Sequence, residues 1–366
     1  MNRVSKLAAI AALSTLSLAA CSSSTTTATT ATSASGSGPA LSCPAGQITA
    51  EGSSAQSNAI QDVIAAYADA CASKSKIEYN PTGSGAGIKN FNAGLVDFAG
   101  SDSALKADEA ATAKTRCKGN AAWDLPMVVG PIAFSYNLSG VGKLVLNADV
   151  LAKIFQGKIT TWNDPAIAAL NSGVTLPSTK ITVFYRSDDS GTTENVSKYL
   201  KANAPTVWTP DTSKTWKGVG GEGKNKSSGV AEAVKATVGS IGYMEWSYAT
   251  DNKLGIAQID TGAGPVELTS ANVGKAVEAA AVTGTGNDLS LKLDYATKVA
   301  GAYPAILVTY EIVCSTGLDS TKSAIVKDFL TYFSSEKGQS SLESLGYAPL
   351  PSSLRTKVAT AVQAIN

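Results

Sequence analysis

The chain has 366 residues, of which 44% are apolar and 16% are charged. That length exceeds what one hydrophobic core usually organises, so a packed protein with two lobes is expected. Lys and Arg number 30 and Asp and Glu 29, for a formal net charge of +1. This excludes the basic surface that binds a nucleic acid backbone. There is no histidine, which excludes Ser-His-Asp nucleophiles and His-containing zinc sites. The composition therefore favours ligand binding without metal or hydrolysis.

Residues 1–20 have the pattern of a secretory signal peptide. Arg3 and Lys6 precede an apolar run, residues 7–20, that is too short to span a membrane. Residues 18–21, Leu-Ala-Ala-Cys, resemble the bacterial lipobox, in which the cysteine carries a diacylglycerol group after cleavage. An ordinary signal peptide with an unrelated Cys21 is the alternative. We expect a mature protein that is lipid-anchored through Cys21 at the extracytoplasmic face of the cell membrane.

Residues 21–44 are expected to comprise the lipidated cysteine and a flexible tether. From Ser22 to Ala40 nearly every residue is Ser, Thr, Ala or Gly. Such a segment cannot bury enough surface to offset its chain entropy. The folded body is therefore expected to begin at residue 45.

The remaining cysteines are even in number, which in an exported chain predicts two disulfide bonds. Three pairings are possible, and local sequence does not choose among them. Buried free thiols are the alternative. The candidates are Cys43, Cys71, Cys117 and Cys314.

Helical and strand patterns alternate along the body, which predicts an α/β fold with mostly parallel sheets flanked by helices. Gly130-Pro131 separates two expected strands at a point where the chain can change direction, so a lobe boundary is expected there. Strands are expected at residues 76–79, 96–99, 125–129, 132–136, 181–185, 241–244 and 305–313. Helices are expected at residues 57–71, 88–93, 105–114, 148–155, 193–202, 230–238, 272–282, 321–333 and 354–365.

Three segments of small and hydroxyl residues each open an expected helix. They are residues 52–54 (Gly-Ser-Ser), 83–87 (Gly-Ser-Gly-Ala-Gly) and 190–192 (Ser-Gly-Thr). A helix N-terminus exposes unpaired N–H groups and a partial positive charge of about half a unit, so it can hold an anion. One such loop is usually only a turn. Three in one chain indicate an anion-binding site.

Arginine is scarce, and Arg186 leads the segment 186–193, Arg-Ser-Asp-Asp-Ser-Gly-Thr-Thr. A guanidinium four residues before a helix start can hold an oxyanion from the side while the backbone holds it from the end. Asp188 is near enough to orient that guanidinium. The alternative is a surface arginine with acidic neighbours.

Several segments, in the same order, resemble the PstS family of high-affinity phosphate-binding proteins of bacterial phosphate ABC importers. They are 79–89 (Tyr-Asn-Pro-Thr-Gly-Ser-Gly-Ala-Gly-Ile-Lys), 97–102 (Asp-Phe-Ala-Gly-Ser-Asp), 155–162 (Phe-Gln-Gly-Lys-Ile-Thr-Thr-Trp) and 186–193. The similarity extends from about Gln47 to the C-terminus. It implies a two-lobe periplasmic-binding-protein-like fold whose hinge is two crossing segments. Lobe I would comprise residues 45–129 and 303–366, and lobe II residues 130–302.

The resemblance also implies what the protein binds. Its ligand would be inorganic phosphate, and its partner an ABC permease with two membrane subunits and an ATPase. The body would be monomeric, without a cofactor and without enzymatic activity. The phosphate-binding residues carried over from the family motifs are Ser54, Ala55, Gln56, Ser84, Asp102, Arg186, Ser190, Gly191 and Thr192.

The carboxylate of Asp102 decides which anion is accepted. A carboxylate facing a fully ionised anion leaves two desolvated like charges together, which costs on the order of several kcal/mol. A protonated phosphate removes the conflict because it donates to the carboxylate. Sulfate has no proton at neutral pH, and a mismatched buried polar group can produce rejection above about 10⁴-fold. We therefore expect phosphate to be strongly preferred over sulfate.

The family fold also bears on the cysteines. It would place all four in lobe I, and we expect the pairs Cys71–Cys117 and Cys43–Cys314.

Three other functions are weaker alternatives. A hydrolase is suggested by Ser-x-x-Lys at residues 73–76 and 334–337, but the partner motifs of such enzymes are missing. A nucleotide site is suggested by residues 218–225, which have Asn where Ser or Thr must meet the metal, so a surface loop is expected instead. In a glycan-binding lipoprotein, Trp208, Trp216 and Trp246 would be sugar platforms, although packing is their expected role.

Overall fold

The structure is a computed structural model that describes residues 40–366. The predicted signal peptide, Cys21 and most of the predicted tether therefore lie outside the described residues. Within residues 40–366, none of the helices combines the length and the apolar character needed to cross a membrane.

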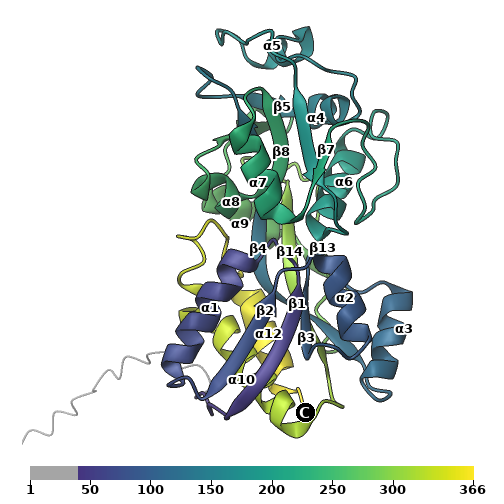
Figure 1. Cartoon of the computed structure of the whole chain (residues 1–366), viewed down its shortest axis with the longest axis vertical. Helices are drawn as coiled ribbons and strands as arrows, with labels where there is room; N and C mark the ends of the chain where they lie inside the picture. The colour runs from purple at the N-terminus through teal and green to yellow at the C-terminus, as the bar shows by residue number, and fades with distance from the viewer. Residues whose placement is uncertain (1–39) are drawn as a thin grey trace, which may run out of the picture. The chain divides into compact units, whose positions relative to one another are not determined.

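Nine strands form one sheet, which is the frame of the fold (Figure 1). They are β1 (Gly46–Gly52), β2 (Ser75–Asn80), β3 (Phe98–Ser101), β4 (Ala122–Asn137), β6 (Thr182–Arg186), β7 (Glu222–Lys224), β8 (Ser240–Glu245), β9 (Gly255–Ile256) and β14 (Ile306–Cys314). Their order is β2-β1-β3-β14-β4-β8-β6-β7, with β9 beside β4. β1 pairs in parallel with β2 and β3, and β6 pairs in parallel with β7 and β8. The α/β prediction is confirmed, and the sheet is mixed because β4 and β14 run antiparallel to their neighbours.

β4 is a single strand of 16 residues, whereas two strands were predicted on either side of Gly130-Pro131. It pairs with β14 as far as Pro131 and with β8 from Ile132 onward. The prediction of a change in direction is therefore wrong: the strand changes its partner at this point instead. Proline removes one donor from a hydrogen-bond ladder, and it stands here where the ladder is passed from one partner to the next.

Twelve helices are described, and each of the predicted helices is confirmed to within a few residues. They are α1 (Ser57–Ala70), α2 (Ser84–Asn92), α3 (Ala107–Arg116), α4 (Ala148–Phe155), α5 (Pro165–Leu170), α6 (Gly191–Asn203), α7 (Lys226–Ala236), α8 (Trp246–Asp251), α9 (Ser270–Glu278), α10 (Ser320–Ser334), α11 (Glu336–Gln339) and α12 (Ser352–Gln363). The sequence patterns missed the short α5, α8 and α11 and the strands β1, β7 and β9. They also missed two small sheets, made of β5 (Val145–Asn147), β10 (Gln258–Asp260) and β11 (Pro265–Val266), and of β12 (Ala281–Val282) and β13 (Leu291–Lys292).

The two ends of the described chain share one core. Helix α10 packs on β1 and α1, and α12 packs on α10 and β4; Figure 1 shows the purple N-terminal and yellow C-terminal elements together. The ring of Phe329 in α10 lies 5.6 Å from that of Tyr67 in α1 and 6.0 Å from that of Phe98 in β3. Elements far apart in the sequence therefore support the strands β1 and β3.

A second aromatic cluster packs against β6 and β8. The ring of Trp216 stacks on Tyr185 at 5.3 Å and on Tyr243 at 5.4 Å, and Trp208 is fully buried. Trp208 packs inside the protein, and Trp216 is half-buried against aromatic rings, so neither is the exposed platform that a glycan-binding protein needs. Trp246 is half-buried at the start of α8.

The disulfides are Cys43–Cys71 and Cys117–Cys314, so the expected pairing is wrong although the prediction of two disulfides is confirmed. The chain before β1 runs beside the end of α1, which brings Cys43 to Cys71, the residue that follows α1. Cys117 follows α3 and meets the last residue of β14. Three of the four cysteines stand at the end of a helix or strand. Which ends lie side by side depends on the packing of the whole fold, so the local sequence does not predict the pairing.

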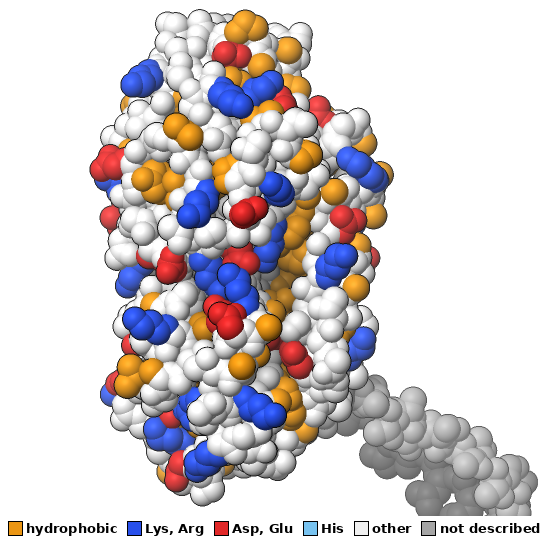
Figure 2. All heavy atoms as spheres, turned by 90° about the vertical axis from the view of Figure 1, so that its right-hand side faces the viewer, with side chains coloured by type: hydrophobic (Ala, Val, Ile, Leu, Met, Phe, Trp, Pro, Cys, Tyr) orange, Lys and Arg blue, Asp and Glu red, His pale blue; other side chains and the backbone are white. Residues whose placement is uncertain are grey.

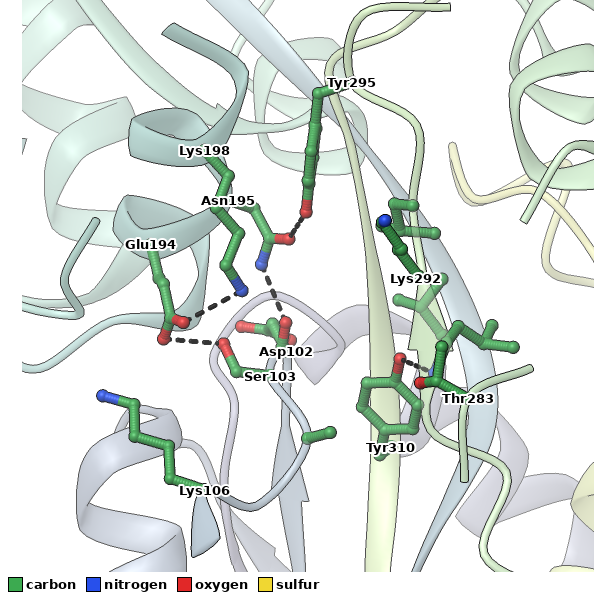
Figure 3. Close-up of a pocket in the computed structure, with 14 residues that line it drawn as sticks. Asp102, Ser103, Lys106, Glu194, Asn195, Lys198, Thr283, Lys292, Tyr295 and Tyr310 are labelled. Atoms are coloured by element: carbon green, nitrogen blue, oxygen red, sulfur yellow. Dashed lines mark hydrogen bonds and ion pairs between the residues drawn. The ribbon is translucent and has the colours of Figure 1, made fainter. Parts of the chain in front are cut away.

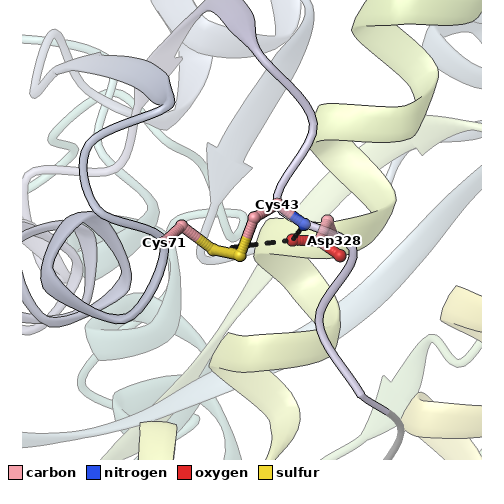
Figure 4. Close-up of side chains that lie close together, drawn as sticks. All are labelled: Cys43, Cys71 and Asp328. Atoms are coloured by element: carbon pink, nitrogen blue, oxygen red, sulfur yellow. Dashed lines mark hydrogen bonds between the residues drawn. A yellow bond between two sulfur atoms is a disulfide. The ribbon is translucent and has the colours of Figure 1, made fainter.

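Asp328 on α10 joins the first of these disulfides to the body (Figure 4). Its carboxylate accepts from the main-chain N–H groups of Ser42 at 2.7 Å and Cys43 at 3.1 Å. Residues 42 and 43, assigned to the tether by composition, are therefore bonded to the folded body. Asp328, Cys43 and Cys71 form the one described cluster close enough to hold a metal ion, but the disulfide removes both thiolates as ligands.

Candidate functional site

Three helices begin at the loops that the sequence identified as anion-binding candidates. Helix α1 begins at Ser57, shortly after residues 52–54, and α2 begins at Ser84, directly after Gly83. Helix α6 begins at Gly191, and the Ser190 hydroxyl caps it by accepting from the Thr193 N–H at 3.2 Å. These loops follow the carboxyl ends of β1 and β2, which are parallel to each other, and of β6, which belongs to the separate parallel set with β7 and β8.

Asp102 follows β3 and is only 3% exposed. Its Oδ1 accepts from Ser53 Oγ at 2.5 Å and from Thr309 Oγ1 at 2.7 Å, and its Oδ2 accepts from Ser84 Oγ at 3.0 Å. Burial raises the pKa of Asp102 to about 6, and the Glu245 carboxylate contributes, although the three hydroxyls act in the opposite direction. Asp102 is thus a buried acceptor, surrounded by donors that can rotate toward a ligand.

Arg186, the last residue of β6, is 2% exposed. Its Nε and Nη2 donate to the two carboxylate oxygens of Asp188 at 2.7 and 2.5 Å. Its Nη1 donates to Ser227 Oγ at 3.0 Å and to Thr192 Oγ1 at 3.4 Å. Burial opposes the charge of Arg186, but Asp188 outweighs burial and raises the pKa of the guanidinium. The predicted orienting role of Asp188 is visible: it fixes the fork and directs Nη1 toward the hydroxyls.

The segments that carry Asp102 and Arg186 meet at Gly191. A Cβ atom built on Gly191 would lie 2.5 Å from Asp102 Cβ and 2.6 Å from Ser84 Oγ. Nearby, the Gly85 N–H donates to the Asp189 carbonyl oxygen at 3.0 Å. The N-termini of α2 and α6 and the end of β3 are therefore in contact, with no room for a side chain at position 191.

The first loop divides its residues between the site and the core. Ser54 Oγ lies 3.2 Å from Ser227 Oγ, and the Ala55 N–H donates to Ser53 Oγ at 3.0 Å. The Gln56 side chain instead donates to the Tyr79 hydroxyl at 3.1 Å. Ser54 therefore joins the other site residues directly, whereas the amide of Gln56 is bonded within the core.

The site residues form a connected series of contacts across the sheet. Ser53 contacts Asp102, which contacts Ser84, and both Asp102 and Ser84 border Gly191. Thr192, the residue after Gly191, continues the series: it contacts Arg186, Arg186 contacts Ser227, and Ser227 contacts Ser54. The structure thus brings together six of the predicted residues, Ser54, Ser84, Asp102, Arg186, Gly191 and Thr192, with Ser190 as the cap behind them.

Sequence reasoning missed Ser227, which is 1% exposed and is the second residue of α7. It expected this helix to begin at residue 230. The segment 225–229, Asn-Lys-Ser-Ser-Gly, has the same small and hydroxyl composition as the three recognised loops, so the signal was present. Its neighbour, the Gly-rich segment 218–225, includes β7, and its last residue precedes α7 directly.

Glu245, the last residue of β8, was also missed. It is fully buried, and its Oε1 accepts from Thr192 Oγ1 at 2.7 Å. Its Oε2 has no hydrogen-bond partner among the described residues. No local pattern marks Glu245, because an acidic residue between a strand and a helix is ordinarily solvated.

A third buried carboxyl group, Glu311 in β14, lies behind the site. It is fully buried, and neither of its oxygens has a hydrogen-bond partner among residues 40–366. Burial raises the pKa of Glu311 to about 8, and the Asp102 carboxylate adds to the effect. Glu311 is therefore mainly protonated at neutral pH, which limits the negative charge around the site.

Replacing Glu311 with Gln is expected to flatten the pH dependence of stability. The ordinary pKa is 4.5 and the folded value about 8, so the free energy of unfolding falls as the pH rises through that interval. The fall is about 3–5 kcal/mol. Gln cannot ionise, so the variant should exceed the wild type in stability at pH 9 and match it near pH 4.5. Urea unfolding at both pH values measures this; parallel pH profiles would contradict it.

The charges near the site are balanced. Lys198 pairs with Glu194 at 2.9 Å, and Lys214 pairs with Glu109 at 3.3 Å. Figure 2 shows the face that lies to the right in Figure 1, where basic and acidic side chains are intermixed. Attraction of an anion therefore depends on local donors and not on a field of one sign.

The arrangement is suited to a compact tetrahedral oxyanion that carries a proton. Hydroxyls, main-chain N–H groups at helix N-termini and one guanidinium supply donors. Asp102 supplies the acceptor; of the two other carboxylates in contact with these donors, Asp188 is paired with Arg186 and Glu245 accepts from Thr192.

Comparison with known proteins places the chain in a family. Residues 19–337 match the PBP superfamily domain. Phosphate-binding protein PstS 3 of Mycobacterium tuberculosis (strain ATCC 25618 / H37Rv) is 46% identical over 322 residues, covering 87% of this chain and 86% of that protein. Phosphate-binding protein PstS of Xylella fastidiosa (strain 9a5c) is 36% identical over 290 residues, covering 77% of this chain and 76% of that protein.

Solved structures agree with this placement. The subatomic-resolution structure of PfluDING, a high affinity periplasmic phosphate-binding protein bound with phosphate, matches with a TM-score of 0.71 and 25% identity. The match covers 86% of this chain and 93% of that chain. The chain therefore belongs to the PstS family of phosphate-binding proteins, within the PBP superfamily.

Proposed function

We propose that this protein captures inorganic phosphate between its two lobes and delivers it to an ABC permease for import. One observation carries the proposal: a buried carboxylate, Asp102, and a buried guanidinium, Arg186, face the same helix N-terminus at Gly191 and Thr192. Phosphate fits this pair because it offers oxygens to the donors and a proton to Asp102. The main-chain N–H groups of Ala55 and Gly191 and the hydroxyls of Ser54, Ser84, Ser190 and Thr192 complete the proposed donor set.

Selectivity follows from the acceptor. Three hydroxyls donate to Asp102 in the structure. A protonated phosphate replaces one of these donors, and the released hydroxyl can donate to another phosphate oxygen. Sulfate at neutral pH cannot make this exchange, so it leaves two like charges buried together.

The proposed mechanism is closure of lobe I, residues 45–129 and 303–366, on lobe II, residues 130–302. β4 crosses the proposed boundary and changes its partner there, and the second crossing is the segment that leads into β14. The contact of Gly191 with Asp102 and Ser84 supports a closed arrangement. Closure around the anion excludes water and presents one shape to the permease.

Location and delivery complete the proposal. The mature chain is held at the extracytoplasmic face of the membrane through lipid on Cys21, and residues 22–44 connect this anchor to a monomeric body. The permease consists of two membrane subunits and an ATPase. The body binds phosphate without a cofactor and without turnover.

Equilibrium dialysis of the purified protein with labelled phosphate tests the proposed function. Tight uptake that survives removal of divalent metal ions, with no product formed, is the expected result. Turnover of a phosphoester would favour a hydrolase, and absence of uptake would favour the glycan-binding alternative; either result would overturn the proposal.

Gly191→Ala is expected to weaken phosphate binding by about 10-fold to 100-fold, because overpacking a closed contact costs about 1–3 kcal/mol. The new methyl group would lie 2.5 Å from Asp102 Cβ when the lobes close. Isothermal titration measures the loss. Gly274→Ala in α9 is the matched control, because a Cβ there meets nothing within 4 Å. Equal affinities of the two variants for phosphate would show that residue 191 is not tightly packed against Asp102 and Ser84 in the bound state.

A further inference from the structure

Asn195 in α6 connects both sides of the proposed site through one side chain. It is 2% exposed, and its Nδ2 donates to the carbonyl oxygen of Asp102 at 2.7 Å and to that of Gly191 at 2.8 Å. Its Oδ1 accepts from the hydroxyl of Tyr295. Figure 3 shows the amide between Asp102 and Tyr295.

We infer that Asn195 is a positioning residue that holds the main chain of Asp102 against the N-terminus of α6 and so slows the release of the bound anion. The inference rests on the proposed function. None of the sequence motifs identified Asn195, and no contact with the ligand is required of it. Its role is to fix the position of Asp102, which accepts the proton of the anion, relative to the N-terminus of α6, which binds the anion.

The orientation of the amide follows from its partners. Carbonyl oxygens only accept hydrogen bonds, so the nitrogen of Asn195 must face Asp102 and Gly191. The oxygen then faces Tyr295, whose hydroxyl must donate. Three partners therefore specify one rotamer and one amide orientation, which is the property expected of a residue that sets a geometry.

The bond from Asn195 to Asp102 joins segments that meet only when the site is assembled. Asp102 follows β3 and Asn195 lies in α6, after β6, and these strands are separated by β14, β4 and β8 in the sheet. Ser103 Oγ donates to Glu194 in α6 at 2.9 Å, and Lys214, in the loop after α6, donates to Glu109 in α3 at 3.3 Å. Because Glu109 is partly solvated, its ion pair is worth little, whereas the Asn195 bonds are buried.

A cavity of about 450 Å³ borders the side-chain amide of Asn195. Asp102, Asn195 and Tyr295 line it together with Lys106 and Lys292 (Figure 3). The Asn195 side chain thus stands where the closed contact borders open space. Removing it would let water reach the main chain of Asp102, which would loosen the contact without altering any ligand donor.

The same helix offers a matched control. Asn203, two turns further along α6, donates through Nδ2 to the carbonyl oxygens of Tyr199 at 3.0 Å and Tyr295 at 2.8 Å. It makes the same number of donor contacts, one of them to the main chain of Tyr295, and neither reaches Asp102 or Gly191. A purely structural role of Asn195 predicts that Asn195→Ala and Asn203→Ala behave alike.

The test measures association and dissociation of labelled phosphate in the purified full chain. Asn195→Ala is expected to raise the dissociation rate constant by about 10-fold to 100-fold, since two buried hydrogen bonds are lost. The association rate constant should change by less than about threefold, because encounter precedes closure. Asn195→Asp, which keeps the shape but sets an oxygen against two carbonyl oxygens, should show at least as large an increase.

Asn203→Ala should leave both rate constants unchanged while lowering the melting temperature about as much as Asn195→Ala. Equal dissociation rates for Asn195→Ala, Asn203→Ala and the wild type would overturn the inference. Tyr295→Phe, which removes only the donor to Asn195, should give a smaller increase in the same direction; no change would also count against the inference. Failure of the wild type to bind phosphate would instead refute the proposed function.

Discussion

Arg186→Ala is expected to lower the affinity for phosphate by at least about 30-fold. Truncating one member of a buried, hydrogen-bonded charge pair costs about 2–5 kcal/mol, and every 1.4 kcal/mol is about tenfold in affinity. Arg186 supplies the only guanidinium in the described site, and its Nη1 is directed at Ser227 and Thr192. Neutral donors alone must then hold a divalent or monovalent anion beside a carboxylate. Isothermal titration with phosphate measures the loss.

Two companion variants make this result interpretable. Loss of Arg186 leaves the Asp188 carboxylate without its cationic partner. The double variant Arg186→Ala with Asp188→Asn removes that unpaired charge and should bind phosphate as weakly as Arg186→Ala alone. Arg355→Ala in α12 removes the same charge far along the chain and should bind like the wild type. Affinity within about threefold of the wild type for Arg186→Ala would show that the guanidinium does not hold the anion.

Asp102→Asn is expected to reduce the preference for phosphate over sulfate by at least about 100-fold, more than it reduces phosphate affinity. The carboxylate only accepts in its ionised form, so it rejects an anion without a proton. Asn offers an N–H group at the same place and carries no charge, so sulfate no longer meets a buried like charge. Competition of sulfate against labelled phosphate measures the ratio.

Asp124→Asn is the matched control for this variant. Asp124 is also an aspartate with 3% exposure, and burial together with Asp288 raises the pKa of Asp124 to about 7. Its carboxylate accepts from the Leu105 N–H and the Ser290 hydroxyl and not from the site residues. Its substitution should leave selectivity unchanged. An unaltered ratio for Asp102→Asn would refute the view that Asp102 reads the proton.

The sequence predicted those parts of the site that are local in the chain. A small or hydroxyl residue before an amphipathic segment indicates a helix start, and α2 and α6 begin where that rule places them. Arg186 and Asp188 are two residues apart, so their pairing could be anticipated. Ser84, Asp102 and Arg186 each follow or end a strand of the parallel sets, which is why the motifs converge in space.

What local patterns could not predict depends on neighbours that are distant in the sequence. Glu245 and Thr309 reach the site only because β8 and β14 lie beside β4. The two halves of β4 form one continuous strand, of which the first half pairs with β14 and the second with β8. Residues 130–131 alone do not reveal this change of partner. The disulfide pairing was mispredicted for the same reason: the approach of residues 43–46 to the end of α1 is a property of the packed fold.

A crystal structure of the protein grown with excess orthophosphate tests the central claim most directly. We predict a tetrahedral anion with one oxygen within hydrogen-bond distance of the Asp102 carboxylate and another within reach of Arg186 Nη1, beside Gly191 and Thr192. Density for the anion elsewhere, or a closed site with these side chains still bonded only to each other, would contradict the account.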